Sequence, residues 1–283
     1  MPIFIGTPGD DTLHGTSHND YINGRTGNDL IFGYGSSDIL RGSAGNDTIE
    51  GGDGNDWVSG GNGNDSIYGQ AGTDFLHGND GYDTLWGGSG NDYLNGGGGA
   101  DVLYGEDGDD VLVGSDLNDS LSGGNGDDWV YGSDGKDSLY GNDGYDTLRG
   151  GSGDDQLDGG GGEDDLSGGN GNDVFDYNAL SDSPGFEELS PVVIRDNIFD
   201  FNGNDGNDGN GAALGDQIDL LSIDANLDLS GDQAFTPDQL SYSNGIFVAE
   251  VIGFGIPGSL DLQVHLVGNP PLDITGLTND IIL

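Results

Sequence analysis

An aspartate stands at every ninth position over more than half of the chain, and carboxylates at a regular spacing can bind metal ions. Counting in nines from Asp11 gives 19 positions, and all 19 are aspartate. The series is Asp11, Asp20, Asp29, Asp38, Asp47, Asp56, Asp65, Asp74, Asp83, Asp92, Asp101, Asp110, Asp119, Asp128, Asp137, Asp146, Asp155, Asp164 and Asp173. Carboxylate oxygens are preferred ligands of hard divalent cations. The spacing therefore predicts a repeated metal site.

The residues around each aspartate repeat in the same phase. The residue two positions after each aspartate is always apolar, and glycine stands four positions after each one up to Gly168. Glycine also fills 16 of the 19 places two residues before the aspartate, with His18, Ser36 and Leu117 as the exceptions. A disordered linker rich in glycine and aspartate would not hold this phase, so the repeat predicts an ordered structure.

Each unit divides into a six-residue glycine-rich turn that ends in aspartate and a three-residue strand with the apolar residue in its middle. Alternation along a strand points that middle residue inward. Two units make one flattened coil, and stacked coils lie about 4.8 Å apart. Carboxylates in alternate units then stack on the same edge, where a divalent cation between successive coils would offset their repulsion.

The composition favours cations as the stabilising element. The 283 residues include 52 Asp and Glu against 5 Lys and Arg, so the net charge of −47 repels nucleic acids and anionic membranes. With 32% hydrophobic residues, 59 glycines and no cysteine, neither a large apolar core nor disulfides can hold the chain together. No apolar run approaches the roughly 20 residues of a membrane span, and the start MPIFIGTPGDD lacks the basic region of a Sec signal peptide.

The nine-residue pattern resembles the RTX calcium-binding repeat G-G-x-G-x-D-x-U-x, which residues 51–59 and 60–68 match at every position. The resemblance implies an all-β fold, a parallel β-roll over residues 1–175, with Ca²⁺ between adjacent coils. Loop carbonyls and the 19 aspartates of the series would be the ligands. Stacking on two edges sets a ceiling of about 17 ions. Departures from the pattern at His18, Ser36, Leu117 and Lys136 leave the corresponding sites open.

From about residue 176 the nine-residue phase ends. Residues 196–201, 215–226 and 260–268 look like the segment that follows the repeats in serralysin-type proteases and related type I secretion substrates. The terminal NDIIL is similar to the secretion signal of those proteases. The resemblance implies a β-rich cap with a type I secretion signal over residues 176–283. It also implies a secreted, extracellular protein that the type I secretion machinery exports and whose folding Ca²⁺ then induces.

Motifs of common hydrolases are absent from the sequence. It contains neither H-E-x-x-H nor G-x-S-x-G. The chain therefore does not match the catalytic parts of the zinc proteases and lipases that have similar tails. Paired acids such as Asp109 and Asp110 could imitate a glycosidase dyad, but nearly every turn carries acids. We therefore do not expect an enzyme.

Aromatic residues recur at outward positions of neighbouring coils. They are Tyr68, Trp86 and Tyr104 on one face, and Trp57, Phe75 and Tyr93 on the other. Such ladders could bind an extracellular glycan or surface partner, or they could stabilise an exposed sheet. Three roles stay open: a secreted calcium-binding module, a structural or adhesive extracellular protein, and the non-catalytic tail of an RTX protease or lipase.

Overall fold

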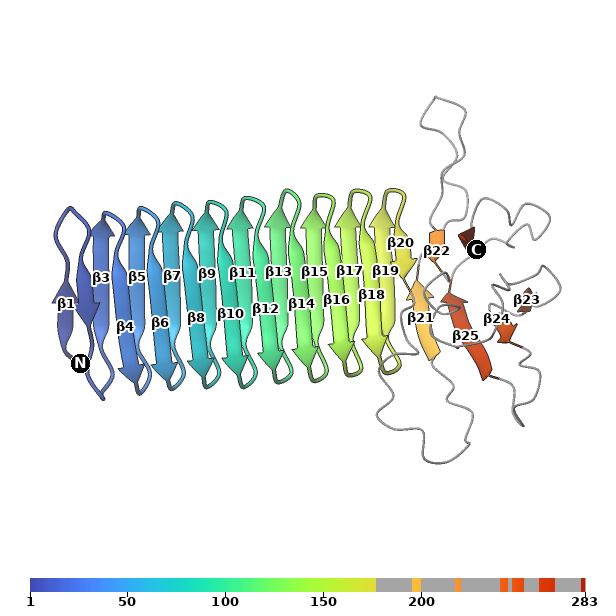
Figure 1. Cartoon of the computed structure of the whole chain (residues 1–283), viewed down its shortest axis with the longest axis horizontal. Coiled ribbons are helices and arrows are strands. Elements are labelled where there is room, and N and C mark those ends of the chain that lie inside the picture. The colour runs from blue at the N-terminus through green and yellow to red at the C-terminus, as the bar shows by residue number, and fades with distance from the viewer. Residues whose placement is uncertain are drawn as a thin grey trace, which may run out of the picture.

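The predicted parallel β-roll is confirmed over residues 1–176 of the computed structural model (Figure 1). Beyond residue 176 the structure describes residues 195–199, 217–219, 240–243, 246–251, 260–267 and 281–282. The chain winds into coils, and each coil contributes one strand to each of two sheets whose strands are parallel over the roll. The coils follow one another along the long axis from the N-terminus. Within these described segments the elements are strands, and none is a helix that could span a membrane.

Successive strands of the roll alternate between the two sheets. In the 14-stranded sheet they are β1 (Ile3–Ile5), β3 (Tyr21–Thr26), β5 (Ile39–Ala44), β7 (Trp57–Asn62), β9 (Phe75–Asp80), β11 (Tyr93–Gly98), β13 (Val111–Asp116), β15 (Trp129–Asp134), β17 (Thr147–Ser152) and β19 (Asp165–Asn170). In the 12-stranded sheet they are β2 (Thr12–His14), β4 (Leu30–Gly35), β6 (Thr48–Asp53), β8 (Ser66–Ala71), β10 (Thr84–Ser89), β12 (Val102–Asp107), β14 (Ser120–Asn125), β16 (Ser138–Asp143), β18 (Gln156–Gly161) and β20 (Val174–Asp176).

Six further strands follow the repeats. They are β21 (Arg195–Phe199), β22 (Gln217–Asp219), β23 (Leu240–Ser243), β24 (Ile246–Val251), β25 (Leu260–Val267) and β26 (Ile281–Ile282). Strand β21 pairs with β19 and β22 pairs with β20, both in parallel, so each sheet of the roll continues into this region. The remainder of the predicted cap lies outside the described residues.

The core is a file of apolar side chains, one from each nine-residue unit. The fully buried members are Ile22, Ile31, Leu40, Ile49, Val58, Ile67, Leu76, Leu85, Leu94, Leu103, Leu112, Leu121, Val130, Leu139, Leu148, Leu157, Leu166 and Phe175. Each is the middle residue of its predicted x-apolar-x strand, as alternation requires. The partly buried Phe4 and Leu13 pack against this file at its N-terminal end.

The interior strands are longer than the predicted three residues. Strand β3 pairs with β5 over Tyr21–Asn23, passes Gly24, and pairs again at Arg25 and Thr26. Both coils have a glycine at this place, so their backbones stay in register beyond it and the ladder resumes. The strands therefore include the first half of each predicted turn, and the 18-residue register is fixed on both sides of the glycine.

Candidate metal centres

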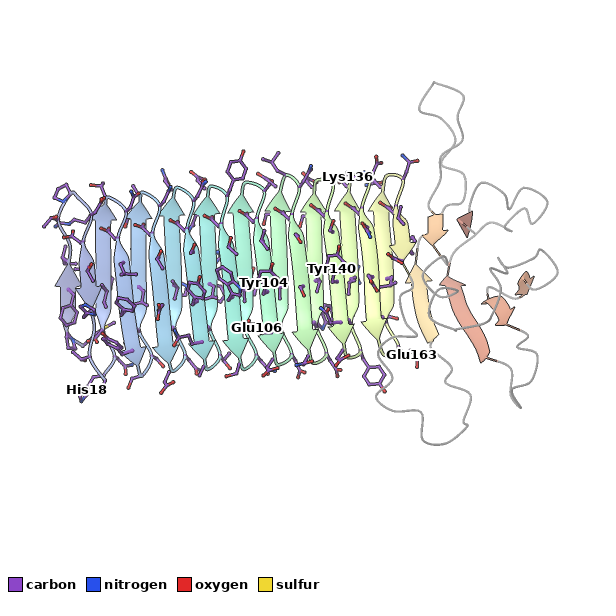
Figure 2. All side chains as sticks on the ribbon, in the orientation of Figure 1. His18, Tyr104, Glu106, Lys136, Tyr140 and Glu163 are labelled. Carbon is purple, nitrogen blue, oxygen red and sulfur yellow. The ribbon has the colours of Figure 1, made fainter. Side chains whose placement is uncertain are left out.

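The strand register gathers the aspartates into two columns, one along each edge of the roll. The first column is Asp11, Asp29, Asp47, Asp65, Asp83, Asp101, Asp119, Asp137, Asp155 and Asp173, and the second is Asp20, Asp38, Asp56, Asp74, Asp92, Asp110, Asp128, Asp146 and Asp164. Figure 2 shows the two edges, with Lys136 on one and His18 and Glu163 on the other. The predicted stacking of alternate units is thus observed.

A hydrogen-bond ladder joins neighbouring aspartates within each column. The backbone N–H of Asp74 donates to Oδ1 of Asp92 at 2.7 Å, and the N–H of Asp92 donates to Oδ1 of Asp110 at the same distance. The same bond recurs for every aspartate donor from Asp11 to Asp155, at 2.7–2.9 Å. The sequence pattern did not reveal this ladder, which fixes the orientation of each carboxylate.

The second oxygen of each interior carboxylate is buried without a hydrogen-bond partner. This holds for Oδ2 at every ninth residue from Asp29 to Asp155, in side chains that are at most 3% exposed. A buried carboxylate oxygen without a donor is costly unless a cation or a proton compensates its charge. The two columns therefore present regularly spaced oxygens that need such a partner.

The first glycine of each repeat leaves space for these oxygens. A Cβ added at Gly87 would stand 2.5 Å from Oδ2 of Asp92 and 2.7 Å from the carbonyl oxygen of Gly105. A Cβ added at Gly69, Gly78 or Gly150 would likewise meet the carboxylate of its own repeat and a glycine carbonyl of the next coil. Carboxylate and carbonyl oxygens of successive coils thus converge beside a bare glycine.

Burial disfavours the charged form of the carboxylates in the metal-free chain. Burial raises the pKa of Asp92 to about 6 even though it accepts the N–H of Asp74. It raises the pKa of Asp110 to about 8, and there the neighbouring carboxylates Asp92, Asp128 and Asp109 raise the pKa further. A cation beside these groups would favour their ionised form.

The available donors fit a hard cation such as Ca²⁺. Within the part of the chain that the structure describes, no three His, Cys, Asp or Glu side chains converge on one point. A site in the roll would therefore combine few carboxylates with backbone carbonyls, and Ca²⁺ accepts such an oxygen-only set in flexible geometry. The sequence has no cysteine, so the thiolate ligands that soft transition metals favour are missing.

Comparison with known families agrees with this donor set. The model of the RTX calcium-binding nonapeptide repeat matches residues 3–31, 32–67, 50–85, 68–103, 86–121, 113–148 and 140–175. The chain belongs to the RTX calcium-binding repeat family. Its cofactor is accordingly Ca²⁺, and its repeats extend through the whole roll.

Among solved structures, the RTX chain is similar to an extracellular lipase from Serratia marcescens. The two are 19% identical with a TM-score of 0.34, over 81% of this chain and 40% of the lipase chain. This chain thus spans about two fifths of the length of that lipase. No curated protein matches it.

Two departures from the RTX pattern preserve the path of the backbone. Ser36 and Leu117 stand where most repeats have glycine, and they adopt φ angles of 72° and 74°. The aspartates of their repeats, Asp38 and Asp119, are buried and accept the usual N–H from the preceding coil. The cost of these substitutions is therefore local backbone strain, and the carboxylate columns continue through them.

The first coil of the RTX roll differs from the interior coils. The backbone N–H of Thr7 donates to Oδ2 of Asp11, and the N–H of Thr16 donates to Oδ2 of Asp20, each at 2.5 Å. The threonine hydroxyls donate to the same oxygens. Both Oδ2 atoms therefore have protein donors, but Oδ1 of Asp20 is buried without a hydrogen-bond partner and still needs a compensating charge. The threonine in place of the second glycine of the repeat is the sequence signal for this difference.

The aromatic ladders form at the predicted positions, and most of their rings contact one another. Tyr68 and Trp86 stack with centroids 4.4 Å apart, Trp86 and Tyr104 at 5.9 Å, and Phe75 and Tyr93 at 4.5 Å. In stacked pairs the ring faces contact each other, which is the cross-strand arrangement that stabilises a sheet. This geometry favours the stabilising role of the ladders over sugar stacking.

Proposed function

We propose that the roll is a non-catalytic, calcium-folded module of a secreted RTX protein. The ions would lie between successive coils along both edges, bound by the aspartate columns and glycine carbonyls, up to a ceiling of about 17 ions. The observation that carries this proposal is the unpartnered, buried Oδ2 at every ninth residue from Asp29 to Asp155. A regular array of such oxygens is costly in a metal-free fold once the carboxylates are ionised.

Dependence of folding on calcium follows from the small core. Each unit buries one apolar side chain, while the whole chain carries a net charge of −47. Without cations, repulsion along the columns opposes closure of the coils. In cytosol with low free calcium the chain would stay expanded and suited to the type I exporter, and it would fold outside the cell as ions bind. The cap over 176–283, with its terminal NDIIL, lies largely outside the described residues.

The test is far-UV circular dichroism of the full chain in EGTA and in CaCl₂, with MgCl₂ as the control. We expect a cooperative gain of strand signal with Ca²⁺ and little gain with Mg²⁺, which requires shorter bonds and octahedral geometry. Elemental analysis of the dialysed protein then counts the bound ions. A strand signal that EGTA leaves intact at neutral pH would refute calcium as the stabilising element.

A further inference from the structure

The outward faces of the two sheets differ in charge. Strands β3 to β17 of the 14-stranded sheet carry the arginines Arg25, Arg41 and Arg149 and only the acids Asp80, Asp116 and Asp134. Strands β4 to β18 of the 12-stranded sheet carry no Lys or Arg, and their acids are Glu50, Asp53, Glu106, Asp107, Asp143 and Asp158. Over these strands the first face carries three arginines and three acids, while the charged residues of the second face are all acids.

The acidic face contains a groove that crosses several strands. The groove has a volume of about 960 Å³, and its walls include the carboxylates of Asp53, Glu106, Asp107 and Asp143. Figure 2 shows Glu106 and Tyr104 over the strands, away from the edges marked by Lys136 and Glu163. These carboxylates are separate from the aspartate columns, so calcium in the columns would leave them charged.

The opposite face carries exposed aromatic residues beside an arginine that has no acid partner in the described part of the chain. Trp57 is 37% exposed and Phe75 is 38% exposed. The Arg41 guanidinium lies over the rings of Tyr21 and Trp57, 5.9 and 5.2 Å from their centroids. Its Nε is buried and has no hydrogen-bond partner among the described residues. The side chain as a whole is only half-buried, so the outer nitrogens of the guanidinium can bind a carboxylate from outside.

We propose that this arginine-bearing face docks onto the acidic groove of a second copy of the chain. Both surfaces are parallel sheets with the same strand spacing, and the arginines of one are complementary in charge to the acids of the other. A guanidinium already held by two rings loses little freedom when it binds a carboxylate. The two faces are different patches of one molecule, so the contact is heterologous and can propagate into rows of molecules.

The test is sedimentation velocity of the calcium-saturated full chain with the variants Arg41→Glu and Glu106→Arg. The native chain should associate more as its concentration rises, and each variant alone should stay monomeric. A 1:1 mixture of the two variants should recover association, because the intact arginine-bearing face of one variant meets the intact groove of the other. Circular dichroism verifies that every variant is folded, which separates this proposal from the calcium-folding proposal.

The matched controls are Lys136→Glu and Glu163→Arg, which make the same charge changes on the edges of the roll (Figure 2). Both controls should associate like the native chain. The docking is refuted if the folded native chain is monomeric at every concentration, or if the single variants associate as it does. Mixed variants that stay monomeric would likewise refute the pairing of one face with the other.

Discussion

Asp74 and Asp92 lie on successive coils, and the backbone N–H of Asp74 donates to Oδ1 of Asp92 at 2.7 Å. The other oxygen of Asp92, Oδ2, is buried beside Gly87 without a hydrogen-bond partner. One carboxylate therefore links two coils through one oxygen and leaves the other for a cation. This division explains why aspartate occupies the interior positions of the series, since its short side chain reaches both partners.

Replacing Asp92 by Ala should weaken calcium-induced folding. The change removes a cation ligand and leaves the buried N–H of Asp74 without an acceptor, which alone costs about 1–3 kcal/mol. The control is Asp11→Ala, at a partly buried position on the first coil where no earlier aspartate donates. The calcium midpoint measured by circular dichroism should rise for Asp92→Ala and change little for Asp11→Ala. Equal midpoints would contradict the stacked columns.

Replacing Gly87 by Ala should disrupt the roll locally, although its backbone φ is ordinary. The new Cβ would stand within 2.7 Å of both Asp92 Oδ2 and the Gly105 carbonyl, which cannot move without breaking the ladder. Gly98→Ala is the matched control, because its Cβ would have no neighbour closer than 3.9 Å. Calcium titrations should show a large rise in midpoint for the first variant only. If both glycines tolerate alanine, the oxygens do not converge as described.

Replacing Leu117 by Gly should stabilise the calcium-bound roll. Leu117 has a φ of 74° and is 57% exposed, so glycine relieves strain there at little loss of packing. We expect a gain of about 1 kcal/mol in the free energy of unfolding, seen as a higher Tm. Ala100→Gly is the comparison, at a position without positive φ, where glycine should destabilise by about 0.5–1 kcal/mol. Parallel Tm shifts in the two variants would argue against strain at Leu117.

The metal-free chain should lose stability as the pH rises from about 5 to about 8. Burial raises the pKa of Asp83 to about 7 and of Asp110 to about 8, so the folded form binds more protons than the unfolded form. The contribution is complete below the unfolded pKa of about 3.9 and is lost as the pH passes the folded values. Circular dichroism in EGTA measures this trend. A metal-free strand signal that grows toward pH 8 would have the wrong sign.

Deleting residues 279–283 should abolish export without altering the repeats. The terminal NDIIL would be read by a type I exporter, as the resemblance to serralysin-type proteases implies. The experiment compares the protein in medium and cytosol of a host that carries the matching exporter. The purified variant should still fold with calcium, which shows that the deletion affects export alone. Undiminished export would contradict the assignment of NDIIL as the secretion signal.

The coil length, the two columns and the core could all be predicted from the sequence. Their regularity comes from local rules: alternation points the middle residue of each x-apolar-x strand inward, and a nine-residue phase with two units per coil repeats every 18 residues. Leu94, Leu103 and Leu112 occupy the core for this reason. A divalent cation followed because acids at this spacing, in a chain without cysteine, leave few other stabilising agents, and the resemblance to the RTX repeat implied Ca²⁺.

The role of each oxygen depended on contacts between coils, which the sequence does not encode residue by residue. The sequence explains glycine by its conformational freedom, but Gly87 has an ordinary φ and is needed because Asp92 occupies the space of its side chain. The sequence alone thus determined the repeat and its need for a cation, because both follow from local spacing. The tertiary structure decided which oxygens remain unpartnered, because that depends on residues brought together across the coils.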